Sequence, residues 1–582
     1  MRLILALSSA LALFGQQQQQ QVPQQSVPDP SIKLGRITGK VLNAITGEPV
    51  RKATVSLQPA GGQQGGGGQT RGLSAATDNA GAFVFENVNP GNYRLSGEKT
   101  GFIRSNFGGR GGGAIGAQLA IAAGTEKAEV IVRITPQGIV SGRILDEDGE
   151  PMEGVSIQLL RPQYFASQRR IMGAAGNQSN DRGEFRVTNV APGKYYLLIQ
   201  RMNNSNMPLQ QGKEEFGYPR LFFPGVEAIE QAQRVEVGAG QEVANLQMAL
   251  RKVRVYRVRG HVPGIAAPAA QQPGAQAARR GGNGMVIQLR PDGGSSDMMG
   301  PGFGPGMGGG QVRADGSFEI AGVSPGAYKL TLSSFGEGRP KVVGSLKLSV
   351  GNDDVDGVVL APSPLVSFQG KIVIEGDRTA VNMKSVRLQL MSTDMGGMGF
   401  NPPIEVAEDG SFAATELSQD KYRITVTPGA AAYVKAITVG GQNILDTAFD
   451  LSGGGGGAME VLLSTKIATI NGTVEKQKPD DAPGSVVIVK VGPNSELTLL
   501  SSASGQSALA RVDESGKFSV ANLPPGEYKL IAFEEVDLAT ASDPEFLKKF
   551  EDRAATVKIG EGESKSATLK QIRFAETNPS SN

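Results

Sequence analysis

The chain has 582 residues, no cysteine, no tryptophan, one histidine and a formal net charge of +2 at pH 7. Without cysteine it can form neither disulfide bonds nor thiolate metal sites, and so small a net charge gives no long-range field that would attract nucleic acid. The 80 glycines and 33 prolines indicate many turns, and the length is sufficient for several domains.

The first 15 residues are typical of a secretory signal peptide. Arg2 supplies the positive end, and residues 3–14 form an apolar run that is too short to persist as a membrane-spanning helix. A retained N-terminal anchor is the alternative interpretation. No later apolar stretch approaches about 20 residues. We therefore expect a secreted mature chain without a transmembrane segment, in the periplasm, at the cell surface or outside the cell.

Residues 16–34 are rich in Gln and Pro and are expected to be a disordered linker. After them one pattern recurs five times. In each copy a glycine precedes a phenylalanine by two residues and a tyrosine by twelve. The five copies are Gly81/Phe83/Tyr93, Gly183/Phe185/Tyr195, Gly316/Phe318/Tyr328, Gly410/Phe412/Tyr422 and Gly516/Phe518/Tyr528. A fixed spacing of this kind predicts an array of one supersecondary unit.

Each copy of the pattern has a direct structural interpretation. An Asp before the glycine, such as Asp78, predicts a tight turn, because Asp bonds to its own backbone and Gly accepts positive φ. Alternating apolar residues such as Phe83 and Phe85 then predict a half-buried strand. A second turn at Pro-Gly leads into the strand that carries the tyrosine. The tyrosine resembles the tyrosine corner of Greek-key sandwiches, and we expect the aromatic rings in the core.

The rest of each repeat is also built from short strands. Each begins with a strand that contains a central glycine, which usually marks a bulge or the close approach of another backbone. These glycines are Gly39, Gly142, Gly260, Gly370 and Gly472. Six or seven short strands in about 100 residues predict a β-sandwich. The predicted fold class is therefore all-β, a tandem array of five Greek-key (Ig-like/transthyretin-like) β-sandwiches. Only Asp543 to Arg553 shows a helical pattern, and we expect a short helix there.

The order of these motifs resembles the carboxypeptidase regulatory-like domain. In the first repeat the resemblance is carried by Gly39, Val41, Gly47, Pro49, Ala53, Val55, Asp78, Gly81, Phe83, Pro90, Gly91, Tyr93 and Leu95. The second and fifth repeats resemble the family nearly as well. The third departs through insertions, and the fourth has Gln419-Asp420 in place of Pro-Gly. The resemblance covers most of the chain after residue 34. It implies seven-stranded sandwiches, similar to transthyretin-like and starch-binding-like domains, without catalysis.

The repeats define the expected domain boundaries. These are a signal peptide (1–15), a linker (16–34), sandwiches at 35–135, 136–252, 253–362, 363–465 and 466–573, and a disordered tail (574–582). The second sandwich carries an aromatic insert at 203–225, and the third has Gly/Pro-rich inserts. Loops rich in Gly, Pro, Ala or Gln are expected to be mobile. They are residues 61–68, 108–113, 264–284, 298–310 and 453–457.

The sequence offers little for catalysis. His261 is the single histidine. It lies beside the glycine of a strand, and the sequence does not indicate a Ser-His-Asp triad around it. A zinc site would need several nitrogen or sulfur ligands, and the chain offers at most one. No glycine-rich stretch continues as Gly-Lys-Ser/Thr into a helix, as a phosphate loop would. The acidic runs 146–150 and 353–356 could bind calcium, but both lie where a solvated turn is expected. We predict no catalytic residue, no metal site, no cofactor and no enzymatic activity.

Sugar binding is the most specific alternative. Carbohydrate sites on sandwiches use exposed aromatic rings that stack on sugars. The candidates are the aromatic cluster of the second repeat, namely Tyr164, Phe165, Tyr218, Phe222 and Phe223. The other interpretation is that residues 222–225 fasten the insert to the sandwich.

The predicted function is that of a secreted, non-enzymatic structural or interaction protein. It would serve as a spacer, scaffold or adhesive array of the cell envelope or extracellular space, with an unidentified protein or polysaccharide partner and no nucleic acid. The alternative is an array of carbohydrate-binding modules. Five domains laid end to end would reach roughly 150 Å.

Overall fold

The computed structural model describes most of the chain after residue 32. The described residues are 33–60, 72–108, 118–165, 168–201, 209–211, 214–264, 285–292, 298–299, 309–334, 341–393, 403–429, 431–454, 457–475, 484–492, 497–500, 508–513, 515–536 and 538–577. The expected signal peptide, nearly all of the linker and most of the loops expected to be mobile lie outside these residues. Strands make up most of what is described, in many separate sheets, which confirms the all-β class.

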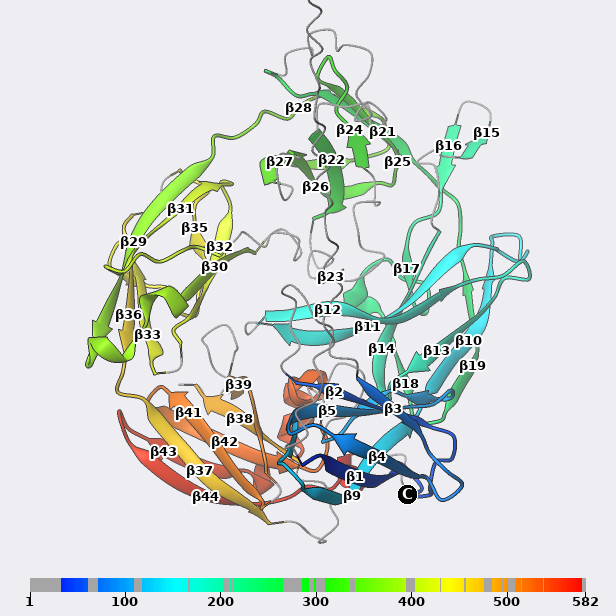
Figure 1. Cartoon of the computed structure of the whole chain (residues 1–582). Coiled ribbons are helices and arrows are strands. Elements are labelled where there is room, and N and C mark those ends of the chain that lie inside the picture. Colours follow the sequence, from blue (N-terminus) through cyan, green and yellow to red (C-terminus); the bar gives the residue numbers. More distant parts are fainter. Residues whose placement is uncertain are drawn as a thin grey trace, which may run out of the picture.

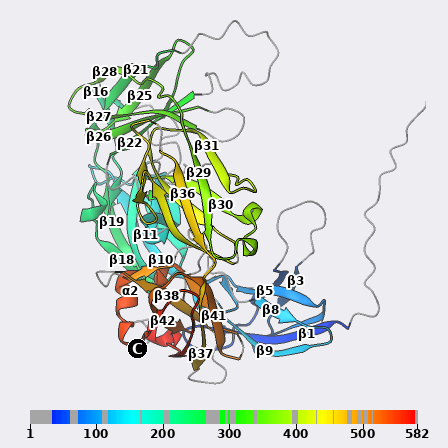
Figure 2. The ribbon, with the colours of Figure 1, turned by 90° about the vertical axis from the view of Figure 1, so that its left-hand side faces the viewer.

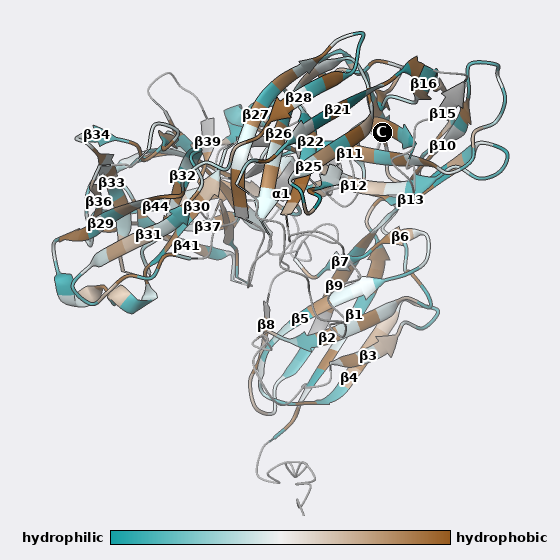
Figure 3. Cartoon of the chain, turned by 90° about the horizontal axis from the view of Figure 1, so that it is seen from above, coloured by the Kyte–Doolittle hydropathy of each residue, from teal (hydrophilic) through white to brown (hydrophobic). Residues whose placement is uncertain are grey.

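The first sandwich contains nine strands in two sheets. They are β1 (Gly35–Asn43), β2 (Thr54–Pro59), β3 (Leu73–Ala76), β4 (Ala82–Val88), β5 (Gly91–Glu98), β6 (Phe102–Ile103), β7 (Ser105–Asn106), β8 (Gln118–Ile121) and β9 (Glu126–Pro136). One sheet has the order β4-β1-β9-β6 and the other β3-β2-β5-β7, with β8 on β5. The strands alternate buried and exposed residues, as β1 does, and hydrophobic and hydrophilic colours alternate accordingly (Figure 3).

The second sandwich repeats this plan and adds the insert. Its elements are β10 (Gly138–Leu145), β11 (Val155–Phe165), β12 (Gln168–Gln178), β13 (Glu184–Val190), β14 (Gly193–Arg201), β15 (Leu209–Gln211), β16 (Glu214–Gly217), β17 (Leu221–Phe222), η1 (Ile229–Gln231), β18 (Arg234–Val237) and β19 (Glu242–Ala249). The sheets are β13-β10-β19 and β17-β14-β11-β12, with β18 on β14.

The third sandwich shares two of its strands with the second. It contains β20 (Val253–Arg254), β21 (Tyr256–His261), β22 (Met285–Pro291), β23 (Met298–Met299), β24 (Gly309–Gln311), β25 (Ser317–Val323), β26 (Gly326–Ser334), β27 (Lys341–Val350) and β28 (Val355–Val359). Its sheets are β25-β21-β28 and β24-β22-β26-β27. Two of these strands pair with strands of the second sandwich, β20 with β16 and β23 with β12. The inserts of the third repeat therefore contain some paired strand.

The fourth sandwich distributes its strands differently. Its elements are β29 (Val366–Glu375), η3 (Arg378–Ala380), η4 (Met383–Ser385), β30 (Arg387–Ser392), β31 (Ser411–Leu417), β32 (Lys421–Thr427), β33 (Tyr433–Val439), β34 (Gln442–Asn443), β35 (Phe449–Asp450) and β36 (Met459–Ser464). Here β33 joins the first sheet, whose order is β31-β29-β36-β33-β34, and leaves β30-β32-β35 as the second sheet.

The fifth sandwich carries the α-helices of the described chain. Its elements are β37 (Ala468–Glu475), β38 (Ser485–Val491), β39 (Leu497–Leu499), β40 (Leu509–Arg511), β41 (Lys517–Leu523), β42 (Gly526–Phe533), α1 (Leu538–Ala541), α2 (Pro544–Lys548), η6 (Glu551–Arg553), β43 (Ala555–Ile559), β44 (Ser564–Lys570) and α3 (Phe574–Thr577). The sheets are β41-β37-β44 and β39-β38-β42-β43, with β40 on β38.

Two expectations for the fifth repeat can be compared with these elements. The predicted short helix is confirmed as α2, which Asp543 caps by accepting the N–H of Glu545 at 3.0 Å. The prediction that 574–582 is disordered is wrong for 574–577, because Phe574 is buried and begins α3. The apolar ring of Phe574 makes this turn part of the domain.

The hydrophobic cores follow the repeats. Five main cores each take their residues from one consecutive stretch of the chain, namely 37–134, 140–250, 256–360, 366–463 and 468–569. The second and fifth sandwiches have an additional apolar layer on the outer face of one sheet. The boundaries between the domains, as assigned from the sequence, remain predictions.

The phenylalanine of each repeat packs over the strand glycine. The five pairs lie directly opposite each other in neighbouring strands, as Gly39 lies opposite Phe83 and Gly260 opposite Phe318. A Cβ on Gly39 would lie 2.1 Å from the carbonyl oxygen of Val130 and 2.6 Å from Phe83 Cζ. The glycine thus leaves room for both the ring and the next backbone, which confirms the expected close approach. An aromatic ring over a strand glycine is a known device for stabilising such a position.

The tyrosines form tyrosine corners in all five copies. Each hydroxyl donates a hydrogen bond to the carbonyl four residues upstream. The acceptors are Asn89, Ala191, Ser324, Ser418 and Pro524, at 2.8, 2.5, 2.8, 3.0 and 2.7 Å. The resemblance seen in the sequence is therefore confirmed in atomic detail, including in the fourth repeat, which lacks Pro-Gly.

Removing one of these tyrosine hydroxyls tests how much it contributes to the stability of its sandwich. Burial raises the pKa of Tyr528, so its hydroxyl stays a donor at neutral pH. Tyr528→Phe leaves the Pro524 carbonyl without this donor and is expected to destabilise the fifth sandwich by about 1 kcal/mol. Hydrogen exchange measured peptide by peptide should show faster exchange in residues 517–533. Unchanged exchange there would contradict a stabilising role for the hydroxyl.

The turn before each phenylalanine is built in two ways. Its glycine has positive φ in all five copies, from 69° at Gly81 to 85° at Gly410. In the first and fifth copies the carboxylate three residues earlier accepts backbone N–H groups, as Asp78 does at 2.8 Å. In the second copy the acceptor is the side-chain amide oxygen of Asn180, three residues before Gly183, and not the neighbouring Asp181. The amide supplies the same oxygen at the same spacing from Gly183.

The five sandwiches close into a ring (Figure 1). The fifth lies beside the first at the base of the molecule (Figure 2), and Arg133 of the first makes an ion pair with Glu534 of the fifth. The two end domains contact each other, so the five sandwiches do not reach the roughly 150 Å that they would span if laid end to end. Among the described residues no helix is long and apolar enough to cross a membrane.

Candidate functional site

The aromatic insert of the second repeat is the site that the sequence singled out. Phe222 is only 1 % exposed and lies in the outer apolar layer with Leu160, Tyr196 and Leu198. Phe223 is partly buried and packs on the main core of the second sandwich. The ring faces of Phe222 are covered, so it cannot stack on a sugar. The expectation that it forms part of an exposed platform is corrected, and for this residue the insert is fastened to the sandwich instead.

Of the remaining candidates, the structure describes the side chains of Tyr218 and Phe223. Tyr218 packs on the same main core, and the guanidinium of Arg201 lies 5.1 Å from its ring centroid. Burial, followed by the negative charge of Glu147, raises the pKa of Tyr218. The side chains of Tyr164 and Phe165 lie outside the described residues, although their backbone belongs to β11. The structure therefore brings Tyr218 and Phe223 together against one core, with one face of Tyr218 already occupied by Arg201.

The insert instead joins the second sandwich to the third. Its hairpin β15–β16 continues into β20, so that Phe216 and Gly217 pair with the chain that enters the third sandwich. Arg257 of β21 holds the hairpin with a two-pronged ion pair. Its Nε lies 3.0 and 3.1 Å from the carboxylate oxygens of Glu215, its Nη2 lies 2.5 Å from Oε1, and its Nη1 contacts Glu319.

We call the contacts of Arg257 with Glu215 and Glu319 the Arg257 clamp, and its charges are largely removed from water. The side chains of Arg257 and Glu215 are 26 % and 15 % exposed. Hydrogen bonds to Glu215 and then to Glu319 raise the pKa of Arg257. Two-pronged guanidinium–carboxylate pairs fix orientation as well as distance. This ion pair could not be predicted from the repeats, because Glu215 lies in an insert with no counterpart in the other repeats.

A second arginine of the insert is buried near the third sandwich. Burial lowers the pKa of Arg220, and the nearby Tyr328 and Glu227 partly offset this effect. Burial raises the pKa of Tyr328, the corner tyrosine of the third sandwich.

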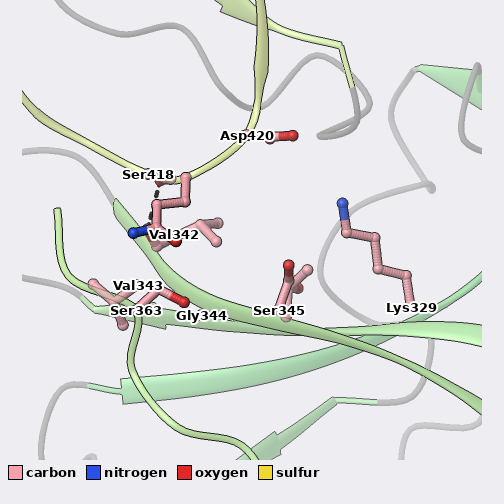
Figure 4. A pocket seen from close by; sticks show the side chains of 10 residues that line it. Lys329, Val342, Val343, Gly344, Ser345, Ser363, Ser418 and Asp420 are labelled. Atoms are coloured by element: carbon pink, nitrogen blue, oxygen red, sulfur yellow. Dashed lines mark hydrogen bonds between the residues drawn. The ribbon is translucent and has the colours of Figure 1, made fainter. Parts of the chain in front are cut away.

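The junction between the third and fourth sandwiches contains a small pocket (Figure 4). It is lined by Lys329, Val342 and Ser345 on one side and by Ser418 and Asp420 on the other, and its volume of about 20 Å³ has room for one water molecule. Ser418 Oγ donates to the Val342 carbonyl at 2.6 Å. The fourth repeat therefore contacts its neighbour through Ser418, the residue directly before Gln419-Asp420.

The comparison with protein families agrees with the first repeat. Residues 36–124 match the family model of the carboxypeptidase regulatory-like domain. The first sandwich is a carboxypeptidase regulatory-like domain. The match ends just before β9, the strand that pairs parallel with β1 and completes that domain. The same glycine–phenylalanine pair and tyrosine corner in the other four sandwiches show that they repeat the geometry of the carboxypeptidase regulatory-like domain.

Solved structures with some similarity are multidomain surface proteins. The minor pilin GBS52 of Streptococcus agalactiae is 15 % identical, with 41 % of this chain and 100 % of that chain covered and a TM-score of 0.20. A streptococcal ancillary pilin is 12 % identical, with 57 % of this chain and 99 % of that chain covered and a TM-score of 0.20. Two B repeats of the collagen binding protein of Staphylococcus aureus are 8 % identical, with 74 % of this chain and 100 % of that chain covered and a TM-score of 0.13. No curated protein matches the chain.

The acidic runs and the histidine have ordinary structural roles. Asp146 accepts N–H groups within its own turn, and Glu147 pairs with Lys252 at 2.8 Å. Asp354 and Asp356 both pair with Arg259 at 3.0 Å. Among the described residues no group of three or more His, Asp or Glu side chains is placed to hold a metal ion. His261 ends β21 with an exposed side chain.

The junction between the fourth and fifth sandwiches is a network of four charges. Lys435 Nζ lies 2.6 Å from Glu375 and 2.7 Å from Glu561, and Lys466 Nζ lies 3.0 Å from Glu375 and 3.5 Å from Glu561. Hydrogen bonds from Lys435 lower the pKa of both carboxyl groups below their ordinary value of 4.5. Glu561 belongs to the β43–β44 turn of the fifth sandwich, so the network crosses between the domains.

This network gives the junction a predicted pH dependence. A carboxyl group with a lowered folded-state pKa contributes stability above its ordinary pKa and loses it as the pH falls through the lowered value. Lys435→Met should therefore lower, at pH 7, the temperature of the calorimetric transition in which the fourth and fifth sandwiches unfold, and the difference from the wild type should shrink as the pH falls below 4.5. Differential scanning calorimetry across this range measures it. A difference that persists undiminished at pH 3 would contradict an ionic origin.

Proposed function

We propose that this chain is a secreted, non-enzymatic scaffold or adhesive array of the cell envelope or extracellular space. The observation that carries the proposal is that the sandwiches are fixed to their neighbours by specific contacts outside the repeated core. The Arg257 clamp, the Ser418 hydrogen bond and the Lys435 network lie at three successive junctions. Such contacts give the domains a defined arrangement and leave their loops to bind partners, as is usual for rigid sandwiches.

The ring favours a compact scaffold over a long spacer. Because the first and fifth sandwiches are in contact, the two ends of the array lie together, and the chain does not extend the distance between two attached structures. A scaffold of this shape holds several loop-bearing domains at fixed positions around one centre (Figure 1).

Cell fractionation, a hydrolase screen and one binding assay test this function. The tagged chain should be recovered in processed form in the envelope or the medium, and the purified chain should show no turnover in a broad hydrolase screen. Recovery in the cytoplasm, or sustained turnover of any hydrolase substrate, would overturn the proposal. Retention on a panel of polysaccharides distinguishes the scaffold from the carbohydrate-binding alternative.

One feature favours the carbohydrate-binding alternative. An open groove of about 760 Å³ lies on the β13-β10-β19 sheet of the second sandwich and is lined by Arg143, Asn177, Glu184, Arg186 and Gln247. Its size is in the range of small-molecule sites, and its amide, guanidinium and carboxylate groups could hydrogen-bond to sugar hydroxyls. These residues are different from the aromatic candidates of the sequence.

Substitution of the groove distinguishes this alternative. If the chain is retained on a polysaccharide, Arg143→Ala with Gln247→Ala should reduce that retention. Arg51→Ala, an exposed arginine of the first sandwich, is the matched control. Equal retention of both variants would exclude the groove as the sugar site.

A further inference from the structure

The ring is closed by a buried ion pair between its two end domains. Arg133 Nη1 on β9 lies 3.3 Å from Glu534 Oε1 after β42, and their side chains are 16 % and 5 % exposed. The arginine nitrogen meets this oxygen as a charge contact and not as a well-aligned hydrogen bond. A buried charge that loses its partner is strongly unfavourable. The two end domains are therefore held together by residues from opposite ends of the chain.

Glu534 is itself held in position by its own domain. Its Oε2 accepts the N–H of Phe574 at 3.0 Å, and its backbone N–H donates to the Ile572 carbonyl at 2.8 Å. Phe574 is the first residue of α3 and is buried. The carboxylate that receives Arg133 is thus presented by the C-terminal turn of the fifth sandwich, which explains why this turn is ordered.

A helical segment beside Glu534 extends the contact to the second sandwich. Residues 538–553 carry α1, α2 and η6, and they cover the outer face of β38 and β42 with a second apolar layer that contains Phe533, Phe546 and Phe550. Helix α1 contacts β11 of the second sandwich. The pKa of Arg234 on β18 is raised mainly by the hydrogen bond that Arg234 makes with Tyr196, and to a smaller extent by the charges of Glu545 and Asp543. The start of α2 thus lies within the range of the charge of Arg234 in the second sandwich.

We infer that the Arg133–Glu534 pair and the helical segment 538–553 form a latch that holds the array closed. The fifth sandwich uses one continuous surface, built from these two parts, to bind the first and second sandwiches. Loss of the ion pair opens the ring into an extended array, while each sandwich keeps its own core. This inference does not depend on the proposed function, because it concerns only the arrangement of the domains.

Cross-linking detects the closed state directly. The chain has no cysteine, so two introduced cysteines are its only thiols. Arg94 and Arg511 are exposed residues of the first and fifth sandwiches, and Arg511 lies within the range of the charge of Arg94, which together with burial lowers its pKa. A full-length chain with Arg94→Cys and Arg511→Cys should cross-link within one molecule through a short bis-maleimide. Failure to do so in this otherwise unchanged chain would overturn the closed ring.

Charge exchange then tests the latch. Arg133→Glu or Glu534→Arg in that background should slow intramolecular cross-linking about tenfold or more, and the two changes together should restore it. In small-angle scattering the single variants should lengthen toward roughly 150 Å, the span of five domains end to end, and the double variant should return to the wild-type curve. Arg36→Glu is the matched control, since Arg36 pairs with Glu126 on the surface of the same sandwich.

Three results would overturn the latch. The first is unchanged cross-linking in both single variants, and the second is a double variant that stays open although its circular dichroism is that of the wild type. The third is cross-linked dimers in place of intramolecular product, which would assign the surface to a second copy of the chain. If Arg133→Glu unfolds the first sandwich, Glu534→Gln, which keeps the shape of the side chain, gives the same comparison.

Discussion

Gly260→Ala is expected to destabilise the third sandwich by about 3 kcal/mol, the upper part of the range for overpacked cores. The new Cβ would lie 2.1 Å from the Val358 carbonyl oxygen and 2.4 Å from Phe318 Cζ. The oxygen belongs to the backbone of the parallel neighbour β28, so it cannot rotate away as a side chain would. Either β21 must separate from β28, or the Phe318 ring must leave its place in the core.

The third sandwich also provides the control for this substitution. Gly351 lies in the turn between β27 and β28, and a Cβ there would meet nothing within 4 Å. Gly351→Ala is expected to change the stability by less than about 0.5 kcal/mol. Because a chain of several domains does not unfold in one step, hydrogen exchange of the β21 and β25 peptides is the suitable measurement. Equal protection in the two variants would contradict the close approach.

Phe222→Ala is expected to destabilise the second sandwich by about 3–5 kcal/mol, as for other large buried rings. The side chain is 1 % exposed and β17 pairs with β14 through this residue. Removing it leaves a cavity between β14 and the insert, so hydrogen exchange should increase in residues 193–201 and 221–226. Phe222→Leu, which keeps most of the apolar volume, should cost clearly less.

The same variants separate fastening from sugar binding. If Phe222 acted as a stacking ring, Phe222→Ala would abolish retention on polysaccharide while leaving hydrogen exchange unchanged. Increased exchange in the Ala variant, with a smaller change in the Leu variant, is the result expected of a buried side chain.

The repeated core could be predicted from the sequence because it is local and periodic. Gly39, Phe83 and Tyr93 recur at fixed distances, and turn chemistry together with strand alternation assigns each of them a place before any contact is known. The structure confirms these places in all five copies. Even the weak fourth copy makes the tyrosine corner through Ser418.

The junctions could not be predicted, because they depend on single residues without a repeating context. Nothing in the sequence distinguishes Arg133 on β9 or Glu534 after β42 from other charged residues, and their pairing depends on how five domains turn relative to one another. The aromatic density of the insert was visible, but an exposed platform and a buried anchor have the same composition. Only the packing of Phe222 against Leu160 and Leu198 decides between them.

The parallel pairing of the first and last strands in every sandwich has a mechanical consequence. β1 pairs parallel with β9, and the equivalent pairs are β10/β19, β21/β28, β29/β36 and β37/β44. The chain thus enters each domain at one pole and leaves it at the opposite pole. Tension between the termini of a domain slides these two strands past each other, so their hydrogen bonds bear the load simultaneously instead of opening one after another.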